Sequence, residues 1–201
     1  MAFKRVVSDK PVKDLTPLDV TCTSTRCTDQ FHCFKASNKA LEKYGKAGVC
    51  RDCGADPVDW DRIRRQDPKD TGYTIDMLKM ELLRYLYWDR PLSSETRAYT
   101  IYRGKEKIKA RAAKILRQKI GKAVNFHEGY QTPKKGKEII HFAQHATATC
   151  CRACLENWHN FPPGTDLTDD QIEYCTNWIM RFVEEKVPDL PEIGDGKHKK
   201  L

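Results

Sequence analysis

Five cysteines and a histidine lie within the first third of the chain, at spacings typical of metal ligands. The segment Cys50-Arg51-Asp52-Cys53-Gly54 places two thiols two residues apart, and its glycine allows the backbone to turn beneath a metal ion. One such pair is a weak signal, but Cys22, Cys27, His32 and Cys33 could complete a tetrahedral site. We predict a structural zinc site formed by Cys27, Cys33, Cys50 and Cys53, with Cys22 or His32 as substitutes. The alternative is that these cysteines are reduced core residues.

A second group of ligand-type residues occupies positions 145–159. If this segment is helical, Cys151, Cys154 and Trp158 share one face, which is the spacing of core residues as much as of ligands. The flanking histidines His145 and His159 could complete a metal site with this pair of thiols, or could be hydrogen-bonded structural residues. A second zinc site at Cys151, Cys154 and His159 therefore stands beside simple burial.

Two sequence blocks resemble a bacterial and phage family that is known only as a domain of unknown function. They are EGYQTP (128–133) and FAQHATATCCRACLENWH (142–159), and a proline–glycine and leucine–threonine step then leads into a last amphipathic helix. The resemblance covers about residues 105–190. The HCF, CRDCG and VDWDR segments also look like the N-terminal half of longer members. The resemblance implies no established activity.

The same blocks are rich in hydrogen-bonding side chains, too many for a purely apolar core. One interpretation is that these side chains buttress a zinc site. The other is a pocket for hydrolysis at a nucleotide, in which a carboxylate positions water, an imidazole transfers protons, a guanidinium holds a phosphate and an indole stacks on a base. The catalytic residues would then be Glu128, Gln131 and His145, and the substrate would also contact Gln144, Arg152 and Trp158. The base would have to be extruded from the duplex.

The chain is basic, with 36 Lys and Arg against 28 Asp and Glu, a net charge of +8 and a pI near 9.0. Residues 105–122 contain eight Lys or Arg and one acidic residue, whereas residues 160–192 are strongly acidic. A basic helix can neutralise phosphates, so we predict nucleic acid, with DNA preferred, as the partner. The expected contacts are Lys109, Arg111, Lys114 and Arg117. The alternative is a solvated helix face.

Periodicity and capping signals predict the elements that hold these residues. Helices are expected over 36–44, 74–89, 105–122 and 147–159, and after a capping box at Thr168 and Gln171, with Gly104 dividing a run that starts at Ser93 or Ser94. A strand is expected over 138–143. The fold class is mainly α with a small zinc-ribbon-like element (α+β). The expected divisions are a basic arm (1–20), a zinc-knuckle region (21–70), a compact helical domain (71–192) and a basic tail (193–201).

These features favour a DNA-acting, zinc-stabilised hydrolase of the base-excising (DNA glycosylase) type, in repair or in antiviral defence against modified DNA. The first alternative is a non-catalytic zinc module that binds nucleic acid. The second is a metal-dependent nuclease, which the lack of a two-metal carboxylate cluster disfavours. The first ten residues lack the apolar region of a secretion signal, and no apolar run is long enough to cross a membrane. We therefore expect a cytoplasmic protein with reduced cysteines and no membrane partner.

Overall fold

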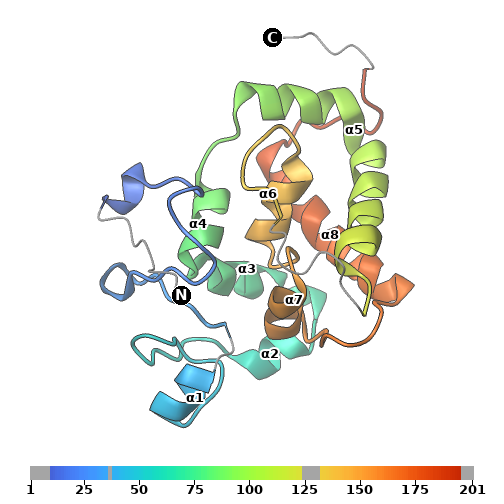
Figure 1. Ribbon diagram of the computed structural model, residues 1–201. Helices are drawn as coiled ribbons and strands as arrows, with labels where there is room; N and C mark the ends of the chain where they lie inside the picture. Colours follow the sequence, from blue (N-terminus) through green and yellow to red (C-terminus); the bar gives the residue numbers. More distant parts are fainter. Residues whose placement is uncertain (1–9, 36–37, 124–131, 196–201) are drawn as a thin grey trace, which may run out of the picture.

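The computed structural model describes residues 10–35, 38–123 and 132–195, and it confirms a mainly helical fold (Figure 1). Over these residues the β-structure consists of two isolated bridges, Arg26 with Phe31 and His32 with Glu81. The helices are α1 (Asn38–Tyr44), α2 (Trp60–Arg64), α3 (Thr71–Lys79), α4 (Leu82–Asp89), α5 (Ser94–Ile115), α6 (Ile139–Ala146), α7 (Arg152–His159) and α8 (Asp169–Lys186).

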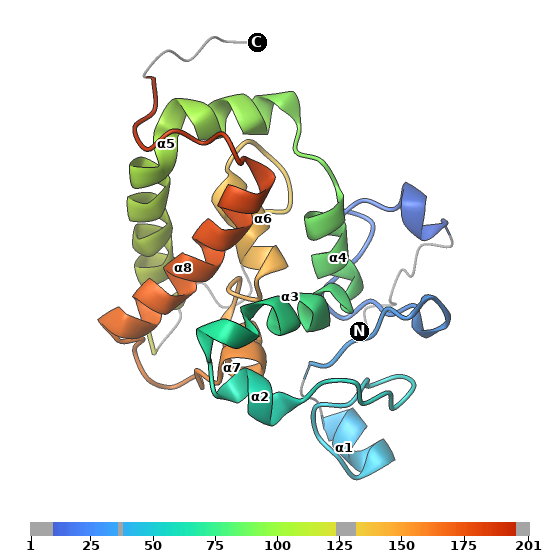
Figure 2. The same cartoon turned by 180° about the vertical axis from the view of Figure 1, so that it is seen from behind.

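Helix α6 is the centre of the helical body. In both views it lies between α4 and α5, and α8 covers its other side (Figures 1 and 2). Ile139, Ile140, Ala143 and Ala146 are each at most 1% exposed. The strand predicted over 138–143 is therefore wrong. These apolar residues recur at helical spacing, and a short buried helix and a buried strand have similar apolar sequences.

Two further predicted helices have different bounds in the structure. The segment 74–89 is divided into α3 and α4 because Glu81 adopts an extended backbone conformation and pairs with His32. The helix predicted from residue 147 begins only at Arg152, since Ala148 has a left-handed backbone with φ of 59°. In both places a tertiary contact or a tight turn overrides the helical pattern.

The predicted capping and breaking signals are confirmed. Thr168 and Gln171 form a reciprocal capping box at the start of α8, and the Ser93 hydroxyl accepts a hydrogen bond from the Thr96 backbone at the start of α5. Gly104 bends α5 with φ of 73°, so the long basic helix is two helical segments at an angle. A π-helical turn at Leu116–Ile120 ends it.

The segment before α3 consists mostly of loops, which pack on one end of the helical body together with α1 and α2 (Figure 2). It nevertheless shares the core: Leu15, Phe34 and Val58 belong to the same apolar cluster as Leu86 and Phe182. A ring contact between Phe34 and Trp158 links this segment to α7, with the ring centroids 6.2 Å apart. The loops that carry the first cysteines are therefore fixed against the helices.

Candidate metal centres

Two loops bring four ligand-type side chains together. The first loop runs from Cys27 to His32 and is closed by reciprocal backbone hydrogen bonds between Arg26 and Phe31. The second contains Cys50 and Cys53, and it turns back through a hydrogen bond from the Gly54 amide to the Cys50 carbonyl. Gly54 is required there because its φ is +78° and a Cβ would lie 2.8 Å from the Tyr44 ring.

The ligand atoms of Cys27, His32, Cys50 and Cys53 all lie within 4.8 Å of one another, so this group could hold a metal ion. The sulfurs of Cys27 and Cys50 are 3.8 Å apart, and the Cys53 sulfur is 3.4 Å from Nδ1 of His32. His32 and Cys50 are buried, whereas Cys53 is exposed. Burial lowers the pKa of His32, which keeps its imidazole neutral and able to donate a lone pair to a metal.

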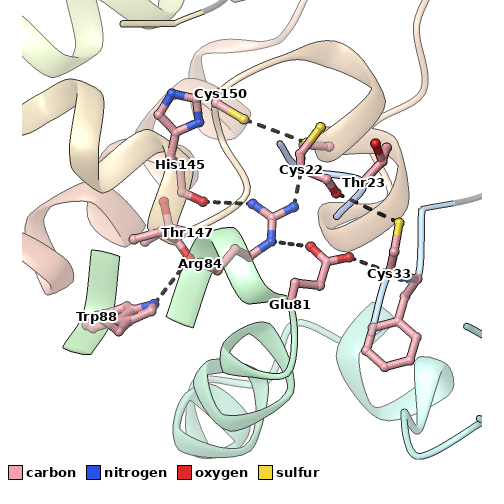
Figure 3. Close-up of polar contacts among 12 residues, drawn as sticks. Cys22, Thr23, Cys33, Glu81, Arg84, Trp88, His145, Thr147 and Cys150 are labelled. Carbon is pink, nitrogen blue, oxygen red and sulfur yellow. Dashed lines mark hydrogen bonds and ion pairs between the residues drawn. The ribbon is translucent and has the colours of Figure 1, made fainter. Parts of the chain in front are cut away.

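Cys33 lies apart from this group, in contrast to the predicted ligand set. Its thiol points to the Cys22 carbonyl oxygen, 3.8 Å away (Figure 3). Side chains of adjacent residues in an extended segment point to opposite sides, so His32 and Cys33 cannot both face the same ion. The structure places His32, which the sequence offered as a substitute, where Cys33 was expected.

A second thiol group lies at the start of α7. The sulfurs of Cys150, Cys151 and Cys154 are within 4.8 Å of one another, and those of Cys150 and Cys154 are 3.7 Å apart. This group could also hold a metal ion. His159 is not part of it, because its ring nitrogens face the Thr147 carbonyl at 2.8 Å and the Tyr174 hydroxyl at 3.3 Å. The place expected for His159 is taken by Cys150.

A buried ion pair lies beside the second thiol group and was not predicted. The Arg84 guanidinium donates to Glu81 at 2.5 Å and to the His145 carbonyl at 2.7 Å (Figure 3). Its remaining amino group is 3.6 Å from the Cys154 sulfur. Both side chains are at most 5% exposed. Arg84 lies in the segment 74–89, where a helix was predicted and where most neighbours of Arg84 are apolar. A cation that is buried in such a helix needs a buried partner, so this position was the signal from which the ion pair could have been predicted.

The predicted catalytic group is only partly described. Glu128 and Gln131 lie outside the described residues. His145 is buried, its Nε2 donates to the Thr132 carbonyl at 2.8 Å, and its ring stacks on Tyr87. Burial lowers the pKa of His145 to about 4.

The predicted substrate contacts of the polar block are internal. Gln144 is 1% exposed and donates to the Thr149 carbonyl, and Arg152 donates to the carbonyls of Pro162 and Thr165. Trp158 is 2% exposed, with its ring 5.1 Å from Trp60 and 6.2 Å from Phe34. The cavity that Trp158 lines measures about 10 Å³, which is room for about one water molecule and far too small for a base.

The basic helix is partly neutralised by acidic residues of the same molecule. Arg111 pairs with Glu138 at 2.5 Å and Arg117 with Asp169 at 2.7 Å. Lys105 and Lys122 pair in the same way with Glu184 and Asp166. Within the described residues Lys107, Lys109 and Lys114 have no ion-pair partner, and all three are exposed.

The fold and these thiol groups define a helical protein with two clusters able to hold a metal ion. A family model described as a domain of unknown function (DUF4186) matches residues 74–184, which is more than half of the chain. The chain therefore belongs to the DUF4186 family. No solved structure matches it.

Only one of the two thiol groups lies within the residues that the family model matches. Cys150, Cys151 and Cys154, together with Glu81 and Arg84, lie within the matched residues, whereas the group around Cys27 and Cys53 precedes them. Over the described residues, the helices are too short or too polar to cross a membrane.

Proposed function

We propose that this protein is a non-catalytic zinc module that binds nucleic acid, with a structural zinc ion held by Cys27, His32, Cys50 and Cys53. The distances between the ligand atoms carry this proposal. Two thiolates bound to one tetrahedral zinc ion at about 2.3 Å lie about 3.8 Å apart, and a thiolate and an imidazole nitrogen lie about 3.5 Å apart. The observed separations are 3.8 Å and 3.4 Å.

Four protein ligands close the coordination sphere, which is typical of structural zinc. The ion would join two loops that are otherwise held by few regular hydrogen bonds. It would also anchor them to the helical body, since the His32 amide donates to the Met80 carbonyl at 2.8 Å. Zinc binding would therefore stabilise the fold of the N-terminal segment.

Zinc content of matched cysteine variants tests this site. Cys53→Ser should lower bound zinc by about one equivalent per chain relative to the parent. Cys33→Ser is the control, because Cys33 is a neighbouring buried cysteine whose thiol points elsewhere. Equal zinc contents in the parent and both variants, or zinc loss in Cys33→Ser alone, would refute the proposed ligand set.

Nucleic acid is the proposed partner because of the net charge of +8 and the exposed lysines of α5. Lys107, Lys109 and Lys114 keep their charge available, whereas Arg111 and Arg117 are already paired with carboxylates. Displacing a phosphate-bound counterion requires such an unpaired cation. The proposed contact with nucleic acid therefore consists of these three lysines rather than of all the basic residues of positions 105–122.

The base-excising hypothesis has less support than the module. The side chains that this hypothesis requires are buried and make contacts within the protein itself. They are the imidazole of His145, the amide of Gln144, the guanidinium of Arg152 and the indole of Trp158. The described part of the chain shows no room for a flipped base beside them. The nuclease hypothesis would need a metal with an open position at a surface that a phosphodiester can reach.

DNA-binding measurements on charge-reversed protein test the partner. Reversal of Lys107, Lys109 and Lys114 to Glu should weaken duplex binding at least tenfold and reduce the salt slope by about 0.9 for each lost phosphate contact. Reversal of Lys13, Arg65 and Lys69, which are exposed on other elements, changes the net charge equally and is the control.

An equal loss of DNA affinity in both triple variants would show a non-specific charge effect. It would contradict the proposal that Lys107, Lys109 and Lys114 contact DNA. The same incubations should leave the DNA intact on gels run with and without alkali. Breaks that appear only after alkali would restore the glycosylase hypothesis, and chelator-sensitive direct breaks would restore the nuclease.

A further inference from the structure

The three thiols of Cys150, Cys151 and Cys154 form a group that the structural zinc site does not use. They are contributed by the turn before α7 and by its first residues. All three are free thiols, and Cys150 and Cys154 are less than 8% exposed. At 3.7 Å, the sulfurs of Cys150 and Cys154 are far beyond the roughly 2.05 Å of a disulfide bond.

This separation is again that of two thiolates on one tetrahedral ion, about 3.8 Å. We propose that Cys150, Cys151 and Cys154 bind a second zinc ion whose fourth ligand is an exchangeable water molecule. Thiolate sulfur is a soft ligand that favours zinc over magnesium or calcium. Three protein ligands with one open position distinguish this site from the closed site at Cys27 and Cys53.

The room for the fourth ligand is beside Cys154. The cavity of about 10 Å³ is lined by Cys154, Arg84 and Trp158, and it is large enough for about one water molecule. The Trp158 indole nitrogen is buried and has no hydrogen-bond partner within the described residues. A buried N–H without a partner is costly, and a metal-bound water or hydroxide in this cavity would supply an acceptor.

The surrounding charges suit a zinc ion with three thiolates, which carries a net charge of −1. Arg84 donates to the Cys154 sulfur but is balanced by Glu81. Lys134 is half-buried, donates to the Val20 carbonyl at 2.5 Å and interacts electrostatically with Cys150, so it provides the compensating positive charge. A buried anionic centre needs such a counter-charge.

The other candidate ligands are placed elsewhere. His159 is held by the Thr147 carbonyl, and the Nε2 of His145 by the Thr132 carbonyl. The Nδ1 of His145 is buried and has no hydrogen-bond partner within the described residues, but it is outside the group whose ligand atoms lie within 4.8 Å of one another. Cys22 lines the cavity but is outside the group whose sulfurs lie within 4.8 Å of one another. The proposal therefore assigns the fourth position to water rather than to Cys22.

Metal content separates this proposal from the structural site. The parent protein should bind two zinc ions per chain, and Cys53→Ser and Cys151→Ser should each lose about one. Cys22→Ser should keep two. One zinc ion in the parent that is unchanged in Cys151→Ser would overturn the second site while leaving the first intact. One zinc ion that is lost in Cys151→Ser and kept in Cys53→Ser would instead overturn the structural site of the proposed function.

Cobalt substitution tests the open position. In full-length Cys53→Ser protein loaded with Co²⁺, added hydrosulfide, which has a single heavy atom as water does, should increase the sulfur-to-cobalt charge-transfer absorption by about one third, because a fourth sulfur ligand replaces water. If Cys53→Ser does not fold, the difference spectrum between parent and Cys151→Ser serves instead. An unchanged spectrum, together with a loss of absorption in Cys22→Ser, would show a closed four-thiolate site and overturn the proposal.

Discussion

At the scale of single residues, Arg84 connects three parts of the molecule. It joins Glu81 in the break between α3 and α4, the C-terminal end of α6 and the first turn of α7 (Figure 3). Its charge is buried, so its partners must remain in place. Removing one partner of such a pair leaves an uncompensated charge in the core.

Replacing Arg84 by Met should therefore lower the free energy of unfolding by about 3–5 kcal/mol. The double variant Glu81→Gln with Arg84→Met should be less destabilised than the single variant, because neither charge is then left alone. Arg97→Met is the control, since its pair with Asp189 is exposed and worth at most about 1 kcal/mol. Urea unfolding measures these three variants and the single variant Glu81→Gln, and a loss in the double variant as large as the sum of the two single losses would contradict a coupled buried pair.

Two buried histidines should make stability depend on pH. Burial lowers the pKa of His145 and of His159 to about 4, whereas an unfolded histidine titrates near 6.5. Between these values the unfolded chain binds more protons than the folded protein, so stability is full above about pH 6.5 and is lost as the pH falls toward 4.

His159→Gln removes one of these titrating groups and keeps a donor for the Thr147 carbonyl. The stability difference between parent and variant, measured by urea unfolding from pH 7.5 to 4.5, should shrink as the pH falls. A difference that stays constant over this range would mean that His159 is not buried in its neutral form.

At the scale of elements, the bend of α5 at Gly104 receives the C-terminal segment. The Lys105 and Glu106 amides, which the bend frees from the helix, donate to the carbonyls of Pro191 and Glu192 at 2.9 and 3.1 Å. A Cβ on Gly104 would lie 2.1 Å from the Gly194 backbone nitrogen. Both the positive φ and this contact exclude other residues.

Gly104→Ala should lower the free energy of unfolding by more than about 1 kcal/mol, because the alanine is strained and displaces residues 193–194. Gly72→Ala is a matched control within α3, where nothing lies within 4 Å of the added methyl group. It should be neutral or stabilising by up to about 1 kcal/mol. Thermal melts that rank the two variants in the opposite order would contradict the observed bend.

The sequence predicts the elements well where local chemistry decides them. Gly104, Ser93 and the Thr168–Gln171 box mark their boundaries through backbone conformation and capping, which depend on a few neighbouring residues. The strand predicted at 138–143 fails because the position of α6 at the centre of the bundle is a property of the whole fold. The break at Glu81 depends on His32, almost fifty residues earlier, and no local pattern reports it.

The two groups of candidate metal ligands could likewise be predicted only where neighbouring residues decide the arrangement. The Cys50–Cys53 pair is recognisable from its spacing, and the structure keeps it. The choice between His32 and Cys33 depends on which side of an extended segment faces the pair, so spacing alone does not decide it. His159 is held instead by the carbonyl of Thr147, which precedes the turn at Ala148, and the spacing in the sequence does not report this contact.

At the scale of the whole molecule, charge is arranged between elements rather than spread over the surface. The basic α5 faces the acidic α8, and exposed pairs such as Arg117 with Asp169 join residues far apart in the sequence. Each of these pairs is worth little in stability, but together they reduce the positive charge available to a polyanion. The eight Lys and Arg residues of positions 105–122 therefore overstate the positive charge that this face offers to a polyanion.

X-ray absorption at the zinc edge of Cys151→Ser protein, in which only the site at Cys27, His32, Cys50 and Cys53 remains, tests whether these four residues hold a zinc ion. We expect one zinc ion with three sulfur neighbours at about 2.3 Å and one nitrogen neighbour at about 2.0 Å. A shell of four sulfur atoms would place Cys33 or Cys22 in the site instead of His32. Absence of zinc would contradict the structural role altogether.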